Sequence, residues 1–325
     1  MAKKIAKRII KRFSVSIFLV LSVIIFGFVL IFFSFFQEEP DFYVFPEKLK
    51  QGDTIFIKIK SEADKITGFL GQDKINFFRK EKNHWISFFG IDAKTKPGNY
   101  KILINLPQGQ ILEKEIIVAT ADFANSPIVL TKELENKGYT EAKIVENITK
   151  KDNPKIEKIF SVYTPEPYFK ESFSFPLSDM EKKGFAFGVF IKSAKNQLQH
   201  FGVDLKAPFK TEIHAINDGR VVFADDLSNY GKTLAIDHGL GIFSLYLHLN
   251  DFKVFFGEMV KKGQIIALSG NSGYSTAPHL HFSIRDAGSR VDPILFIKTT
   301  QKTDDSLGLA NIAKAIMRLF GVVEN

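Results

Sequence analysis

The sequence predicts a mainly β protein that consists of an N-terminal transmembrane helix, a small β-sandwich and a second β domain. Three observations predict this architecture. An early stretch carries no charged residue, apolar and polar residues alternate in short runs over residues 41–119 and again over 173–297, and glycine and proline lie between these runs. A chain of 325 residues is longer than one ordinary domain, so two folded units with connecting segments are expected.

The uncharged stretch from Phe13 to Phe36 is long enough to cross a membrane. At about 1.5 Å per helical residue it spans roughly 36 Å, against a hydrocarbon core of roughly 30 Å. Basic residues precede it and acidic residues follow it, so the positive-inside rule places residues 1–12 in the cytoplasm and the rest of the chain outside. The stretch ends in bulky Phe35 and Phe36, which favours an uncleaved anchor over a signal peptide. We therefore expect a single-pass protein of the cytoplasmic membrane.

Charge and cysteine content exclude two other classes of protein. The net charge is +8, but six of these charges lie in the basic tail 1–12, which leaves +2 for the remainder. A nucleic-acid-binding face needs its excess of positive charge on the folded part, so no nucleic-acid partner is expected. The chain has no cysteine, which excludes disulfides and a lipid-modified cysteine. Any metal site must be built from His, Asp and Glu.

Residues 41–119 have the pattern of a small immunoglobulin-like β-sandwich. Ile55, Ile57 and Ile59 alternate with other residues, as do the apolar residues of 100–106, and glycine- or proline-containing turns separate these runs. The histidine of this region, His84, has no second ligand type at a useful spacing, so a structural role is expected for it. The region is interpreted as a spacer or a binding module.

Residues 120–172 and 298–325 differ from the β regions. Lys, Glu, Asn and Pro become frequent in 120–172, and residues 131–159 have helical patterning, so this segment is interpreted as a partly helical connector. Apolar residues at helical spacing predict an amphipathic helix from Leu309 to Leu319 in the C-terminal tail, and packing against its own protein is favoured over membrane contact.

Six of the seven histidines lie between His200 and His281. In His279-Leu280-His281, a strand would send both histidines to one face, together with Ser283 and Arg285, and the apolar residues between them to the other. Two such imidazoles can serve one metal and one substrate, or can both bind the metal. A merely structural pair that hydrogen-bonds is the alternative.

A second histidine motif lies further towards the N-terminus, at His200 and Asp204. Gly202 and the β-branched Val203 favour a strand or loop there over a helix, so the chain must curl to bring both side chains together. Joined to His281, the motif gives two imidazoles and one carboxylate. Such a set leaves a fourth tetrahedral position open, as in catalytic zinc sites.

Several motifs together carry a resemblance to the lysostaphin and LytM metallopeptidases, over roughly residues 173–297. Each motif is found in the order and at the spacing that this family has. The motifs are His200-Phe201-Gly202-Val203-Asp204-Leu205, Asp218-Gly219-Arg220-Val221-Val222, Tyr230-Gly231, Tyr246-Leu247-His248-Leu249, Gly257 with Gly263-Gln264, Gly270-Asn271-Ser272-Gly273, and Pro278-His279-Leu280-His281-Phe282.

The resemblance implies a compact antiparallel β peptidase domain in which Zn²⁺ is bound by His200, Asp204 and His281. It also implies that His248 and His279 face the reacting peptide, where they can orient water, take its proton or stabilise the oxyanion. If residues 246–248 form a regular strand, Tyr246 and His248 would face the cleft together.

The sequence departs from the family at one point and contains two histidines outside the implied site. An arginine that often follows the Phe-Gly of the entry strand is absent, because Phe187-Gly188 continues as Val189, so substrate contacts or local packing there can differ. Neither His214 nor His238 matches a ligand position, and both are expected to be structural.

The resemblance leaves three functions open. The first is a zinc metalloendopeptidase that hydrolyses peptide stems or crossbridges of peptidoglycan, with cell-wall or division proteins as further partners. The second is a catalytically silent scaffold that binds the wall or activates another hydrolase, and the third is a metallopeptidase with a protein substrate. A complete ligand set favours the active enzyme, because such a site must be complete to work.

Overall fold

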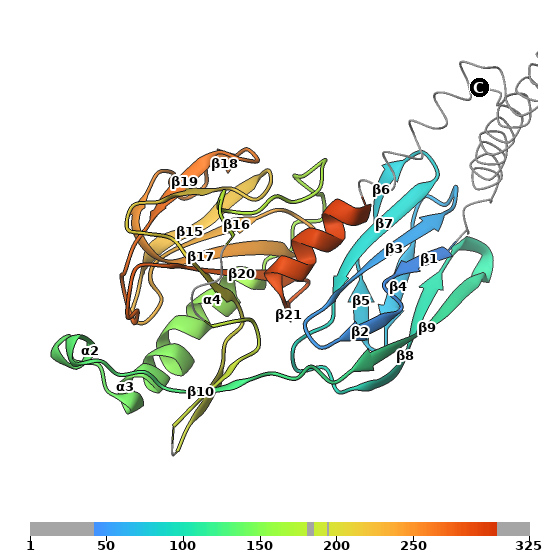
Figure 1. Ribbon diagram of the computed structural model, residues 1–325. Helices are drawn as coiled ribbons and strands as arrows, with labels where there is room; N and C mark the ends of the chain where they lie inside the picture. The colour runs from blue at the N-terminus through green and yellow to red at the C-terminus, as the bar shows by residue number, and fades with distance from the viewer. Residues whose placement is uncertain (1–41, 181–184, 194, 304–325) are drawn as a thin grey trace, which may run out of the picture. The chain divides into compact units, whose positions relative to one another are not determined.

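The computed structural model describes residues 42–180, 185–193 and 195–303 (Figure 1). The predicted transmembrane helix, the basic tail before it and the helix predicted from Leu309 to Leu319 lie outside these residues. Within the described part of the chain, no helix is both long and apolar enough to cross a membrane. The prediction of a mainly β protein is confirmed, because the described residues form 21 strands and a few short helices.

Two sheets enclose the first core. Ile55, Ile57 and Ile59 are fully buried and pack with Ile102 and Ile104 from the facing sheet, as their alternation predicted. One sheet has the order β1 (Phe42–Phe45), β3 (Thr54–Lys60), β7 (His84–Gly90), β6 (Phe78–Glu81). The other has the order β2 (Lys48–Lys50), β9 (Ile111–Ala119), β8 (Gly98–Asn105), β4 (Thr67–Leu70), β5 (Asp73–Ile75), and a 3₁₀ turn over Pro107–Gly109 joins β8 to β9.

Short helices fill the segment after β9, which confirms the helical patterning predicted there. Hydroxyls of Thr131 and Thr140 accept hydrogen bonds from backbone N–H groups three residues on, so each caps the helix that follows. Ile144 and Ile156 are the buried residues of the second and last helices. The elements are β10 (Asn125–Pro127), α2 (Lys132–Asn136), α3 (Glu141–Glu146), a π-helical turn (Asn147–Asp152) and α4 (Asn153–Phe160).

A nine-stranded sheet forms the second β domain, and every strand pair within it is antiparallel. Its main path is β13 (Val203–Leu205), β20 (Leu280–Asp286), β17 (Ile242–Phe252), β16 (Gly231–Asp237), β15 (Gly219–Leu227), β18 (Met259–Val260). Strands β14 (Glu212–His214), β19 (Ile265–Ser269) and β21 (Ser289–Val291) pair beside this path. A small sheet joins β10 to β11 (Phe190–Lys192) and β12 (Gln197–Gln199), and a helix over residues 293–303 follows β21.

Strand β20 has one apolar face, as its period-two pattern predicted. Leu280, Phe282 and Ile284 are fully buried in the main core of this domain, and the ring of Phe282 lies 5.4 Å from that of Tyr246. Residues between them, among them His281, therefore point to the opposite face. The apolar side chains fix which face of β20 is available for chemistry.

We expect Phe282→Ala to lower the free energy of unfolding by about 3–5 kcal/mol, because it removes a buried ring and leaves a cavity. The matched control is Phe255→Ala, at a ring that is 70% exposed, which should change the free energy by less than about 0.5 kcal/mol. Equilibrium denaturation of both variants measures the difference. Equal effects of the two substitutions would contradict the placement of Phe282 in the core.

Candidate metal centre and catalytic cleft

Three of the predicted site residues converge where β13 pairs with β20. Asp204 lies directly opposite His281 in the register of the two strands, and His200 precedes β13 by three residues. Nε2 of His200 lies 2.9 Å from Nδ1 of His281 and 3.1 Å from Oδ1 of Asp204, and His281 Nδ1 lies 3.0 Å from the same oxygen. The three residues form a group that could hold a metal ion.

The donor atoms fit a small divalent cation. Ligands arranged tetrahedrally at about 2.0–2.1 Å from zinc lie roughly 3.3 Å apart, close to the separations found here. His200 Nδ1 lies 2.9 Å from the carbonyl oxygen of Ala186 and must donate its proton to it, which leaves Nε2 with a free lone pair. The second oxygen of Asp204 accepts a hydrogen bond of 3.1 Å from the backbone N–H of Phe185. Both ligands are thus oriented by their surroundings.

The charge state of the group also suits a cation. Burial acts to raise the pKa of Asp204, but His200 and His281 outweigh it and hold this pKa well below its usual value. Burial lowers the pKa of His281 to about 4, so its imidazole is neutral near pH 7. Burial also lowers the pKa of His200, but the Asp204 carboxylate outweighs this effect and raises it. The ionised carboxylate of Asp204 and the neutral imidazole of His281 therefore suit a zinc site, and a bound cation would displace the proton that the raised pKa favours on His200.

Gly202 gives His281 the space that this arrangement needs. A Cβ atom at this position would collide with Nε2 of the His281 ring and would lie 2.7 Å from the carbonyl oxygen of Phe282. From the sequence, Gly202 was used only as evidence against a helix. Its position between His200 and Asp204, which share one site, could have indicated that a ligand side chain needs space there.

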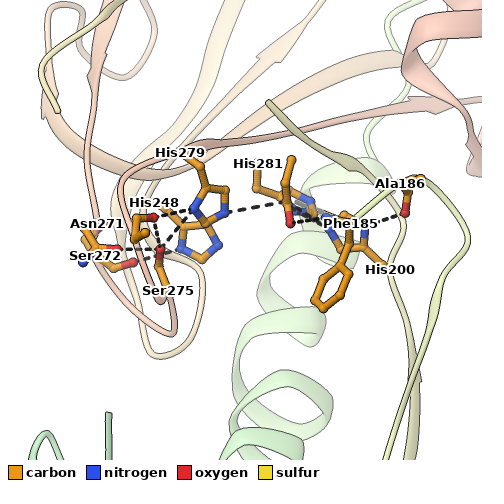
Figure 2. A network of polar contacts seen from close by, with 11 residues as sticks. Phe185, Ala186, His200, His248, Asn271, Ser272, Ser275, His279 and His281 are labelled. Atoms are coloured by element: carbon orange, nitrogen blue, oxygen red, sulfur yellow. Dashed lines mark hydrogen bonds and ion pairs between the residues drawn. The ribbon is translucent and has the colours of Figure 1, made fainter. Parts of the chain in front are cut away.

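His248 and His279 lie next to the ligand group, with ring centroids 4.9 Å apart (Figure 2). The Nδ1 of His248 lies 2.9 Å from the carbonyl oxygen of Ser272, and the Nδ1 of His279 lies 2.8 Å from that of Ala277. A ring nitrogen that faces a carbonyl carries the proton, so Nε2 of each histidine is an acceptor. Nε2 of His279 lies 3.6 Å from Oδ1 of Asp204.

Burial governs the charge of His248. Burial, together with the neighbouring His279 and His281, lowers the pKa of this histidine to about 3. The imidazole is therefore neutral near pH 7 and can accept a proton. The lone pair of a neutral, oriented imidazole beside a metal site is one of the requirements of a general base.

The expectation that Tyr246 faces the cleft beside His248 is wrong. Tyr246 is fully buried, and its hydroxyl lies 3.1 Å from the hydroxyl of Ser244 within the core. The register of β16 with β17 shifts between Lys232 and Leu234, and His248 has a φ of 60°. This irregularity breaks the alternation of side chains, so His248 turns to the cleft while Tyr246 stays inside.

One cavity of about 280 Å³ contains all five predicted site residues. Its polar end is formed by the ligand group and the two further histidines. Most of the remaining wall is apolar, and much of it comes from the segment before the peptidase sheet, which was interpreted from the sequence as a partly helical connector. The aliphatic residues of this wall are Ile128, Val129, Ile144, Ile148, Ile191, Leu198 and Leu247.

The histidines expected to be structural lie away from this cavity. His238 is fully buried between the carbonyl oxygen of Asp218 and the hydroxyl of Ser244, each 2.8 Å from a ring nitrogen. Burial lowers its pKa to about 4, so it is a neutral core residue. His214 lies on β14.

Sequence reasoning missed the loop that supports the two further histidines. Besides the Ser272 carbonyl, the hydroxyl of Ser275 lies 3.2 Å from Nδ1 of His279. Ser275 is buried and also donates to Asn271 at 2.7 Å. The Gly270-Asn271-Ser272-Gly273 motif was the available signal, since Gly273 has a φ of 70°, which glycine adopts readily.

Comparisons with known proteins agree with this geometry. Residues 198–293 match the model of peptidase family M23. The glycyl-glycine endopeptidase ALE-1 of Staphylococcus capitis is 36% identical over 137 residues, which cover 40% of this chain and 37% of that protein. The murein hydrolase activator EnvC of Escherichia coli (strain K12) is 41% identical over 99 residues, which cover 30% of this chain and 24% of that protein.

A solved structure extends the similarity of fold beyond this region. The crystal structure of a candidate M23 peptidase from Pseudomonas aeruginosa has a TM-score of 0.52 and 23% identity, and the match covers 76% of this chain and 94% of that chain. It shows a shared fold. With the family match and the convergence of the predicted residues in one cleft, the chain carries a domain of peptidase family M23, of the lysostaphin and LytM type.

Proposed function

We propose that this protein is a membrane-anchored zinc metalloendopeptidase that hydrolyses peptide bonds of peptidoglycan outside the cytoplasmic membrane. One observation carries the proposal. The complete ligand group of His200, Asp204 and His281 shares a cavity with two histidines whose Nε2 atoms are oriented as acceptors. The family match and relatives named as wall-acting proteins support the choice of substrate.

His248 and His279 have distinct tasks from the ligands. Zinc held by the ligand group supplies the Lewis acidity that lowers the pKa of water toward about 7 and polarises a scissile carbonyl. Nε2 of either further histidine can take a proton from the attacking water, and in protonated form it can stabilise the oxyanion or donate to the leaving amine. The apolar wall of the same cavity lowers the polarity around these groups, which strengthens each of these electrostatic interactions.

An activator without catalysis is the second candidate, because EnvC is named as a murein hydrolase activator. An activator without catalysis would be expected to lack some residues of the site. Here the three candidate ligands and the two further histidines all line one cavity. A metallopeptidase with a protein substrate is the third candidate. The activator and the protein-cleaving peptidase can both be distinguished from the proposed function by the products that the purified protein releases from cell wall.

Incubation of the purified protein with isolated peptidoglycan tests the proposal. We expect soluble muropeptides with newly formed peptide termini, identified by mass, and no release after chelation of zinc. Sugar chains should keep their length, because the reaction cuts peptide bonds. An absence of new termini, with zinc bound, would favour the activator, and cleavage of a protein substrate alone would favour the third candidate.

Substitution of a ligand and of a further histidine should have different effects. Asp204→Ala should lose both zinc and activity, because it removes the only carboxylate of the group. His279→Ala should keep one zinc per chain and lose about 10²-fold or more in rate, the usual scale for a general base or oxyanion donor. His248→Ala should behave like His279→Ala, and His281→Ala like Asp204→Ala.

Metal analysis and turnover of these four variants measure the division of roles. Each pair serves as the control for the other, since all four changes lie in one cavity. A zinc-free His279→Ala protein, or stoichiometric zinc in the Asp204→Ala protein, would show that the ligands are assigned wrongly.

The anchored topology is part of the proposal and rests on the charge asymmetry around Phe13 to Phe36. A protease added outside intact spheroplasts should degrade residues 41–325, because the positive-inside rule places them there. A cytoplasmic marker protein that stays intact is the control for membrane integrity. Full protection of residues 41–325 in intact spheroplasts would reverse the proposed orientation.

A further inference from the structure

The turn between β15 and β16 is held by a carboxylate from the segment that precedes the peptidase sheet. Asp152 is 1% exposed. Its carboxylate accepts backbone hydrogen bonds from Ser228 at 3.0 Å, from Asn229 at 2.7 Å and from Tyr230 at 3.3 Å. Three N–H donors on one buried carboxylate form charge-assisted hydrogen bonds, which are stronger than neutral ones. The position of this turn therefore depends on Asp152.

A second set of contacts holds the same turn from the same helix. The amide of Asn147 donates to Oδ1 of Asn229 at 3.0 Å, and the amide of Asn229 donates to the carbonyl oxygen of Ile144 at 2.8 Å. Asn147 and Asp152 are the first and last residues of the π-helical turn. Single π-helical turns inside α-helices are frequent at functional sites. Here the turn brings two buried polar side chains against one loop.

This turn makes a hydrogen bond to the backbone of His248. The carbonyl oxygen of Tyr230 accepts a hydrogen bond of 3.0 Å from the backbone N–H of His248. His248 has a φ of 60°, a conformation that a residue with a side chain adopts only where its surroundings impose it. The contact with Tyr230 is one of the constraints that impose it.

The same turn also holds the loop that orients both further histidines. The carbonyl oxygen of Asn229 accepts a hydrogen bond of 2.7 Å from the backbone N–H of Tyr274. This loop contributes the Ser272 carbonyl to Nδ1 of His248 and the Ser275 hydroxyl to Nδ1 of His279. The turn therefore contacts His248 directly, through its backbone, and contacts both imidazoles indirectly, through this loop.

We propose that Asp152 is a positioning residue for His248 and His279, so that the π-helical turn over Asn147–Asp152 supports the active site from outside the peptidase sheet. The proposal rests on the proposed peptidase function for the roles of the two histidines. Asp152 lies upstream of residues 198–293, the part that matches the family model. Its side chain touches neither the ligands nor the cavity, and it acts only through the turn at residues 228–230.

Asp152→Asn in the full-length protein tests this role with the smallest change in shape. The amide replaces one acceptor oxygen by a donor, so at least one N–H of the turn loses its partner. Glu146→Gln is the matched control, because it makes the same chemical change at an exposed carboxylate on the same helix. Asp152→Ala is a more severe change at the same position, because it removes both acceptor oxygens.

We expect kcat on wall peptide to fall about tenfold or more in Asp152→Asn, since displacements of about 1 Å at a catalytic group can cost up to about 10²-fold. KM should change less than kcat, although Asn229 and Tyr230 of this turn line the cavity, and zinc should stay at one per chain, because the ligands are unchanged. Glu146→Gln should match the wild type. Imidazole NMR signals of His248 and His279 should shift, whereas those of buried His238 should not.

A merely structural role would give a different result. Activity, zinc content and the His238 signal would then fall together, in proportion to the fraction of protein unfolded. Unchanged kcat and unchanged signals of His248 and His279 in a folded Asp152→Asn protein would overturn the proposal. If the wild type releases no muropeptides, the proposed function fails, but the NMR comparison still tests the positioning by Asp152.

Discussion

The antiparallel pairing of β13 with β20 is the constraint on which the candidate site depends. It sets Asp204 opposite His281. Because side chains alternate along a strand, a slip of one residue would turn His281 into the core and an apolar neighbour into the site. Leu280 and Phe282 prevent this slip, since both are fully buried. The hydrophobic core therefore fixes the geometry of the candidate metal site through the register of two strands, while Ala186 orients His200 and Phe185 orients Asp204.

Features that depend on local periodicity could be predicted from the sequence. The alternating apolar residues of β3 and of β20 were expected to face a core, and all of them are fully buried: Ile55, Ile57 and Ile59 on β3, and Leu280, Phe282 and Ile284 on β20. The histidine and aspartate motifs pointed to one site because their residue types suit zinc and no cysteine competes. The position of Tyr246 could not be predicted, because the break in alternation at His248 arises from a register shift against the neighbouring strand. Such shifts leave no period in the sequence of a single strand.

Contacts between distant parts of the chain escaped the sequence analysis for a related reason. Residues 120–172 have the composition of a connector, and the sequence of a short helix does not indicate which distant surface the helix covers. The structure shows that Ile144 and Ile148 line the cavity while Asp152 and Asn147 bind the turn at residues 228–230. One helix thus contributes an apolar wall and a polar support. The wall in turn lowers local polarity, consistent with the low pKa of His248, whose main cause is burial.

The family match therefore covers a shorter stretch of the chain than the residues that form and support the site. Residues 198–293 contain all three ligands and both further histidines. Yet His200 is oriented by Ala186 and Asp204 by Phe185, both upstream of the match. The supporting contacts extend further, to the helix over residues 141–160. Catalytic groups have to be held to within fractions of an ångström by their neighbours, so the proposed functional unit of this chain includes these upstream segments as well as the strands that carry the histidines.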